Sequence, residues 1–194
     1  MAMLGILKGR NLRSIRSIRH KGKRLSEILE AHGRFVRGDE TGTRADLAGA
    51  DLSKANLEKA NLAYAILTGA NLEGASLREA KLTSADFRQA RMQRVDLRRA
   101  DLTEANLSGA DLTEAQAGGT ELFRADLKSA ILRGADFGAA NFRNAEVRGA
   151  DFRGAVLKTT ILRETNLEGV DLSGVDLSTA LLPHGYNPSQ AVKS

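Results

Sequence analysis

The sequence predicts an all-β solenoid, a rod of stacked square coils, and three observations lead to this fold class. One five-residue pattern recurs in strict phase 28 times between residues 45 and 182, without insertion or deletion. The central residue of each unit, here called position i, is Leu in 21 units and Phe, Met, Val or Ala in the others. Position i−2 is Ala, Val or Thr in every unit. A period of five fits neither a helix nor a flat strand, so the chain must turn once in every unit.

The period also predicts the shape of one coil. If each unit forms one side of a square, four units complete a turn, and each i residue points inward above its equivalent in the previous coil. A large side chain at i leaves room only for a small one at i−2 in a densely packed interior. Position i−1 is Asp or Asn in 17 units, as expected of short side chains that bond to turn backbone. The 28 units would make seven coils, a rod of roughly 34 Å at about 4.8 Å per coil.

These residues carry a resemblance to a known family. The stretch that begins at Ala45, ADLAGADLSKANLEKANL, is similar to the A(D/N)LXX motif of pentapeptide-repeat proteins, and the similarity covers 138 of the 194 residues. The resemblance implies a right-handed quadrilateral parallel β-helix with β-ladders on four faces. It also implies that the family has no catalytic residues in common.

The composition excludes several classes of site. There is no Cys, which excludes disulfides and thiolate metal sites. The three histidines lie far apart without metal-ligand spacing: His20, His32 and His184. No stretch approaches the roughly 20 apolar residues of a membrane-spanning helix. The apolar run before Lys8 is too short, and its charges follow rather than precede it, so we do not expect it to be a secretory signal. We therefore expect a protein without enzymatic activity, cofactor or metal, in the cytoplasm or peripheral at a membrane.

The net charge of +5 conceals an asymmetry. Residues 1–44 contain 11 Lys and Arg against four acids, a net charge of +7. Residues 45–182 contain 17 against 20, a net charge of −3. The basic character therefore belongs to the N-terminal segment, and the solenoid itself is nearly neutral.

Residues 1–24 form a basic arm without a single acid. A mobile solvated tail is one interpretation. A short basic amphipathic helix is another, because Ile15 and Ile18 lie three apart among arginines. Contact with an anionic membrane or nucleic acid and an organelle transit peptide are the remaining alternatives. The candidate contact residues are Arg10, Arg13, Arg16, Arg19, Lys21, Lys23 and Arg24.

Residues 25–44 are expected to cap the N-terminal end of the solenoid. Residues 25–37 have helical spacing of apolar side chains, and Gly38 is placed to end the helix. An open solenoid end exposes Leu side chains and unpaired backbone, so a covering element is required there. The segment is similar to the ILEAH-type segments that often precede such repeats. His32 is expected to be a packed residue of the cap, and residues 39–44 a short linker.

The unit around Ala117, AQAGG, lacks a large residue at i and is followed by two glycines. It predicts a thinly packed or distorted side of the coil. A binding notch would be its functional interpretation, and drift in a tolerant repeat is the alternative.

The C-terminal coil is expected to be poorly covered. Pro183 ends the ladder, and residues 183–194 are too few for a substantial capping helix. The outward i−1 position becomes apolar at Ile161 and Leu181, which are twenty residues apart and should stack on one face. We expect a homodimer through this coil, with residues 183–186 folding back in a monomer as the alternative. The candidate contacts are Ile161, Leu181 and Leu182.

The sequence favours a non-catalytic, rigid protein-interaction or scaffold module whose partner it does not identify. The resemblance suggests an alternative, a DNA mimic that binds DNA gyrase or topoisomerase, as the quinolone-resistance members of the family do. Mimicry requires a strong field of one sign, and a rod with a net charge of −3 supplies a weak one. A further alternative is a rod held at a membrane surface by its basic arm.

Overall fold

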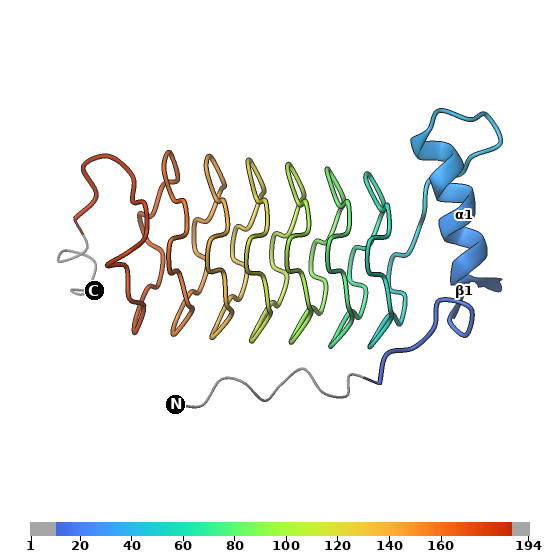
Figure 1. Ribbon diagram of the computed structural model, residues 1–194, viewed down its shortest axis with the longest axis horizontal. Helices are drawn as coiled ribbons and strands as arrows, with labels where there is room; N and C mark the ends of the chain where they lie inside the picture. The colour runs from blue at the N-terminus through green and yellow to red at the C-terminus, as the bar shows by residue number, and fades with distance from the viewer. Residues whose placement is uncertain (1–10, 188–194) are drawn as a thin grey trace.

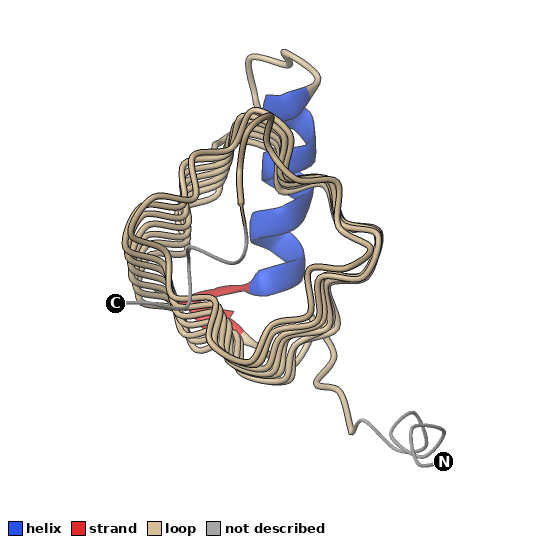
Figure 2. Cartoon of the chain, turned by 90° about the vertical axis from the view of Figure 1, so that its left-hand side faces the viewer, coloured by secondary structure: helices blue, strands red, loops and turns tan. Residues whose placement is uncertain are grey.

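The computed structural model describes residues 11–187, which form a straight rod of stacked coils with one helix at its N-terminal end (Figure 1). Before the coils come two short strands and the helix: β1 (Arg19–His20), β2 (Lys23–Arg24) and α1 (Leu25–Val36). Strand β1 pairs with β2 in an antiparallel hairpin. Seen along the rod, the coils superimpose and α1 crosses their end (Figure 2).

The coils are joined by parallel β-bridges between residues twenty apart, from Asp46 with Ile66 to Ile161 with Leu181. In the first bridge the N–H of Leu47 donates to the Ile66 carbonyl (2.7 Å), and the N–H of Ile66 donates to the Ala45 carbonyl (2.9 Å). This spacing confirms the coil of four five-residue units. Each bridge is a single residue between two turns, so extended strands do not form. The right-handed winding of the coils and their total of seven stay predictions.

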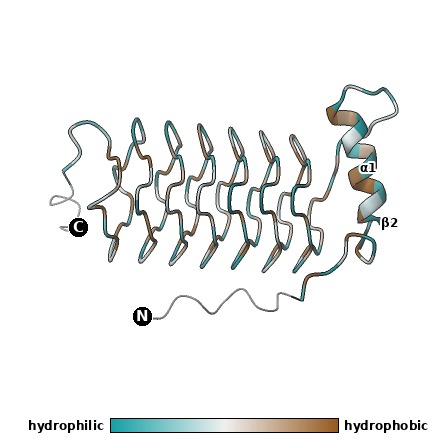
Figure 3. Cartoon of the chain, in the orientation of Figure 1, coloured by the Kyte–Doolittle hydropathy of each residue, from teal (hydrophilic) through white to brown (hydrophobic). Residues whose placement is uncertain are grey.

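The interior of the rod is built from the two inward positions. Every i residue from 47 to 167 is buried, with at most 5% of its surface exposed. Nearly all i−2 residues are equally buried, including three that are threonine. Polar and apolar residues alternate along each coil (Figure 3). The inward assignment of both positions is therefore confirmed, and burial of these aliphatic side chains is the main source of the rod's stability.

Each corner is a turn that the i−1 side chain holds in place. The N–H of Thr103 donates to Asp101 Oδ1 (3.0 Å), and the N–H of Arg153 donates to Asp151 Oδ1 (3.1 Å). Position i+2 lies in the left-handed region, as at Glu104 with φ of 57°. Many residue types occur at i+2, so the sequence alone suggests that this position is almost unrestricted. The structure shows that its backbone conformation is restricted. The signal for the left-handed conformation is the glycine at ten of the 28 i+2 positions.

The unit around Ala117 is neither open nor distorted. Ala117 has 0% of its surface exposed, and its N–H donates to the Asp136 carbonyl (2.7 Å) as in the regular coils. Phe137 is the i residue of the next coil on the same face. Its ring packs edge-on against that of Phe142, with 5.0 Å between the ring centroids. We attribute the normal packing to this larger neighbour, which supplies the volume that Ala117 lacks.

Residues 11–24 differ from the expected mobile tail or amphipathic helix. Arg13 adds a strand residue to the first coil: its N–H donates to the Lys54 carbonyl (2.6 Å), and its carbonyl accepts from Asn56 (2.9 Å). Ile18 has 1% of its surface exposed and belongs to the same core cluster as Leu25. Burial of this side chain and pairing with the coil edge are both unavailable to a solvated tail. Residues 1–10 lie outside the described part of the chain.

Helix α1 occupies the predicted range and ends one residue earlier, at Val36. At its start, the N–H of Arg24 donates to the Glu27 carboxylate (3.0 Å). His32 is fully buried, and its Nδ1 accepts a hydrogen bond from the Ala45 N–H (3.0 Å), the first residue of the repeats. Gly42 packs so closely on the helix that a Cβ there would lie 2.0 Å from the Phe35 nitrogen. These contacts fix α1 against the first coil.

The last coil is less well covered than the others. Apart from Thr165 and Leu167, its inward residues are only partly buried: Val170, Leu172, Val175, Leu177, Ala180 and Leu182. Tyr186 returns toward this end and packs against the same core, after a turn in which its N–H donates to the Pro183 carbonyl (3.2 Å). This is the fold-back arrangement that the sequence offers as the alternative to a dimer. The homodimer through this coil stays a prediction.

Candidate interaction surfaces

The outer surface of the rod consists of the i−1, i+1 and i+2 side chains, and many of their charges are paired. The guanidinium of Arg98 lies 2.5 Å from the Asp96 carboxylate, and that of Arg88 lies 2.7 Å from Asp86. Arg153 and Arg133 both hydrogen-bond to Asp151 and hold the pKa of that carboxyl well below its ordinary value. Several of the turn carboxylates are thus neutralised locally. They provide no continuous acidic field along the described part of the rod.

Two of the seven candidate basic residues are paired with carboxylates of the first coil. Arg13 Nη1 lies 2.9 Å from Asp51 and also donates to Ser53. Lys21 Nζ lies 2.5 Å from Asp46. Both ion pairs join the N-terminal segment to the first coil, so these residues help to fasten the segment.

The other candidates lie near the same end of the rod. Arg19 donates to the Gly22 carbonyl (3.2 Å) across the hairpin turn, and Arg24 precedes α1. Arg16, Lys23 and Arg24 are exposed, and within residues 11–187 no carboxylate lies within 4.0 Å of their charged groups. Arg10 lies outside the described residues. The structure therefore gathers free positive charge at the N-terminal end rather than along a separate arm.

A small cavity of about 180 Å³ lies between the hairpin, α1 and the first coil. Its apolar floor includes Ile28 and Ala31, and its polar rim includes Lys23 and Arg44. The Nε2 atom of His20 is buried at this site without a hydrogen-bond partner in the described part of the chain. No local sequence pattern indicates this cavity, because it joins residues that are distant along the chain.

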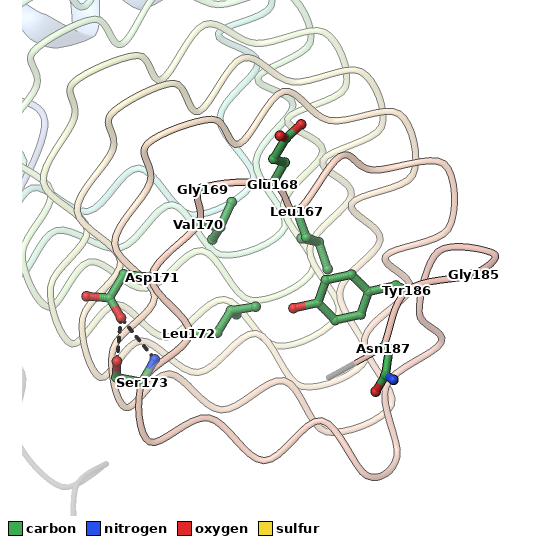
Figure 4. A pocket seen from close by; sticks show the side chains of 10 residues that line it. All are labelled: Leu167, Glu168, Gly169, Val170, Asp171, Leu172, Ser173, Gly185, Tyr186 and Asn187. Carbon is green, nitrogen blue, oxygen red and sulfur yellow. Dashed lines mark hydrogen bonds between the residues drawn. The ribbon is translucent and has the colours of Figure 1, made fainter. Parts of the chain in front are cut away.

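A larger cavity of about 570 Å³ lies at the opposite end (Figure 4). Leu167 and Leu172 line it from the last coil, and Tyr186 faces them from the returning tail. The Tyr186 hydroxyl is buried without a partner among residues 11–187. Burial raises its pKa above the ordinary value.

The three predicted C-terminal contacts do not form one patch. Ile161 and Leu181 are joined by a β-bridge and stack on one face, as the twenty-residue spacing predicts. Leu181 has 44% of its surface exposed. Leu182 is an i residue that points toward the core and is only partly buried. An outward contact would therefore involve Ile161 and Leu181, and a contact with the coil end would involve Leu182.

No cluster of metal-ligating side chains occurs within residues 11–187. In the same range, no helix combines the length and the apolar character needed to cross a membrane.

The family model for pentapeptide repeats matches eight copies, over residues 43–79, 80–115, 120–158 and 140–178. The chain belongs to the pentapeptide-repeat family. This membership confirms the resemblance inferred from the A(D/N)LXX units. Members of the pentapeptide-repeat family are generally non-catalytic structural or interaction modules. No curated protein matches the chain significantly.

Several solved pentapeptide-repeat structures are similar to the chain. HetL, involved in heterocyst differentiation regulation in the cyanobacterium Nostoc sp. strain PCC 7120, is 26% identical over 79% of this chain and 98% of its own, with a TM-score of 0.37. The Nostoc protein alr5209 is 34% identical over 51% of this chain and 82% of its own, with a TM-score of 0.46. Full-length QnrB1, a plasmid-mediated fluoroquinolone resistance protein, is 21% identical over 75% of this chain and 83% of its own, with a TM-score of 0.42.

Proposed function

We propose that the protein is a rigid, non-catalytic scaffold that binds another protein through the outer surface of its coils. One observation carries this proposal. The ladder of bridges runs from Asp46 to Leu181 and holds the outward side chains in register from coil to coil. A rod of this kind presents binding groups that are ordered before the partner arrives, which lowers the entropy cost of association. A cytoplasmic location is part of the proposal.

One corner of the rod offers the best candidate contact. Phe123, Arg143 and Arg163 occupy the same i+1 position in three successive coils, and we call them the Phe123 corner. The Arg124 guanidinium lies over the Phe123 ring, 5.0 Å from its centroid. Within residues 11–187, no carboxylate lies within 4.0 Å of Arg143 or Arg163, unlike Arg98 and Arg153. Unpaired arginines beside an aromatic ring suit an acidic segment of a partner protein.

The test is partner capture by the full chain, quantified by mass spectrometry after cross-linking. Deleting the N-terminal segment would remove Arg13 and α1 from the first coil, so substitutions are preferable to truncation. We expect the variant Arg143→Gln with Arg163→Gln to lose the partner. The matched control is Arg148→Gln with Lys158→Gln, which removes the same charge from two other corners. Equal capture by both variants and the wild-type chain would contradict the role of the Phe123 corner.

Self-association through the C-terminal coil is a second candidate. The stacked Ile161 and Leu181 support it, because Leu181 is one of the few large apolar side chains of residues 11–187 that remain exposed. Light scattering on the wild-type chain and on Leu181→Lys tests this contact. An oligomer that persists unchanged in the variant would show that Leu181 does not take part.

The structure gives less support to a membrane anchor. An amphipathic basic helix would present Ile15 and Ile18 to lipid, but Ile18 is buried and Ile15 packs against the core. The two isoleucines that such a helix would insert into a bilayer therefore pack on the core of the rod instead.

A further inference from the structure

The C-terminal end of the rod combines unpaired backbone with acidic charge. In the earlier coils, i residues donate their N–H groups onward, as Leu162 does to the Leu181 carbonyl (2.8 Å). Within residues 11–187, Leu167, Leu172 and Leu177 have no following coil to which they can donate. Residues 164–187 contain no Lys or Arg. Their four carboxylates are those of Glu164, Glu168, Asp171 and Asp176.

Most of this acidic charge is not neutralised by cations of residues 11–187. Asp171 lies 3.4 Å from Arg153. Glu164 accepts a hydrogen bond from the Asn144 amide (2.9 Å), which carries no charge. No cation of residues 11–187 lies within 4.0 Å of Glu168 or Asp176. Glu168 also lines the large cavity beside Leu167 and Leu172, so charge and apolar surface occur together.

The N-terminal end has the complementary character. Residues 16–24 contain Arg16, Arg19, Lys21, Lys23 and Arg24 and no acid. Of these, Lys21 is paired with Asp46, and the charged groups of the others have no carboxylate within 4.0 Å in the described residues. The hairpin that carries them lies at the extreme end of the rod, opposite the last coil (Figure 1). Phe35 on α1 adds a ring with 36% of its surface exposed.

We propose that the protein associates head to tail, with the basic hairpin end of one copy against the acidic last coil of a second copy. This proposal rests on the second candidate function, self-association, and assigns its geometry. The twofold pairing of last coils expected from the sequence would instead bring the carboxylates of two copies together. Like charges placed opposite one another disfavour that arrangement.

A head-to-tail contact leaves a free basic end and a free acidic end on every assembly. Such a contact does not close unless the rotation between copies returns to the start. The expected product is therefore a row of rods that lengthens with concentration. Its stability should fall with salt, because the Debye length shortens from about 10 Å at 0.1 M to about 3 Å at 1 M.

The experiment uses sedimentation velocity on the full chain and two charge-reversed variants. The first carries Glu164→Lys and Glu168→Lys at the acidic end. The second carries Arg19→Glu and Lys23→Glu at the basic end. None of these side chains lies in the core, and circular dichroism checks that each variant is folded.

We expect the average mass of the wild-type chain to rise beyond a dimer with concentration and to fall in high salt. Each variant alone should associate with itself at least about tenfold more weakly than the wild-type chain does. An equimolar mixture of the two variants should recover association, because each offers the end that the other lacks. The Arg143 and Arg163 variant should behave as wild type, which separates this test from that of the Phe123 corner.

Three results would overturn the proposal. If the average mass of the wild-type chain stops at that of a dimer, and if the dimer becomes more stable as salt rises, the contact would be the twofold one. A monomer at every concentration would exclude the interface. A mixture that associates no better than its components would show that the two ends do not meet.

Discussion

At the scale of single residues, each position of the repeat has one physical task. Position i supplies buried apolar volume, i−1 holds the turn, and i+2 adopts the left-handed backbone. Position i−2 accepts Thr in place of Ala where a carbonyl is available. Thr120 Oγ1 donates to the Leu97 carbonyl (2.9 Å), and Thr160 Oγ1 donates to the Phe137 carbonyl (2.8 Å). Size restricts this position more strictly than polarity does, because the hydroxyl is satisfied.

Replacement of Leu107 by Ala should lower the free energy of unfolding by about 2–5 kcal/mol, since the side chain is fully buried between neighbouring coils. The matched control is Ser108→Ala at the adjacent outward position, where the change should be about 0.5 kcal/mol or less. Urea unfolding followed by circular dichroism measures both values. Equal effects at the two positions would contradict the inward assignment of i.

The neighbouring glycines 118 and 119 test the turn conformation. Gly119 has φ of +67°, whereas Gly118 does not lie in the left-handed region, and neither has an atom within 3.5 Å of an added Cβ. Gly119→Ala should destabilise the protein by about 1 kcal/mol, because left-handed backbone is unfavourable for a residue with a Cβ. Gly118→Ala should be close to neutral. Thermal unfolding compares the two, and a larger loss at residue 118 would contradict the assignment.

At the scale of elements, the sequence predicts what depends on local periodicity and misses what depends on distant pairing. The inward pattern, the coil of four units and α1 all follow from spacings within a few residues. The path of residues 11–24 depends on Arg13 meeting Ala55 and on Ile18 entering the core. Two isoleucines three apart are compatible with a helix, and nothing local indicates the coil edge instead. The two end cavities are missed for the same reason.

The His32 imidazole gives the N-terminal cap a dependence on pH. Burial lowers the pKa of His32 below 6.5, nearby Arg44 lowers it further, and the Ala63 carbonyl opposes both effects. The folded state therefore keeps the imidazole neutral, with Nδ1 accepting from Ala45. The unfolded chain binds the proton more readily. Stability from this group is complete above about pH 6.5 and declines as the pH falls below it.

Urea midpoints measured at about pH 7.5 and about pH 5.5 test this dependence. The wild-type midpoint should fall between the two, and the fall should be smaller in His32→Gln. His20 and His184 are present in both chains and provide the common background. Identical shifts in wild type and variant would show that His32 does not contribute.

At the scale of the whole molecule, net charge differs between the two ends of the rod more than between its faces. The middle coils carry paired arginines and aspartates, whereas the ends carry opposite net charge. The spacing of twenty is enough to predict that Ile161 lies beside Leu181, because the coil period determines the neighbours on a face. The unpaired Arg143 and Arg163 can be recognised from sequence once the pairing rule is known. An arginine at i+1 pairs with an aspartate at i−1 of its own unit, as Arg98 does with Asp96, whereas Arg143 and Arg163 have Asn141 and Ile161 at that position.

The ion pairs on the middle coils argue against mimicry of duplex DNA. We expect the purified protein to leave gyrase supercoiling unchanged at moderate salt, because ion pairs such as Arg98 with Asp96 cancel the field that a mimic needs. Supercoiling assays with and without the protein measure the effect. A clear inhibition or protection that survives Arg16→Gln with Arg19→Gln would instead support the mimic, since it would not depend on the basic end.

The strict period has a consequence for how such a chain can change its length. Removal of twenty residues shortens the rod by one coil, about 4.8 Å, and leaves every remaining residue on its original face. Removal of a single five-residue unit keeps the interior equally well packed but rotates everything after it by a quarter turn. The Phe123 corner would then move to a different side relative to α1. The same fold could thus redirect one binding surface against another without altering either surface.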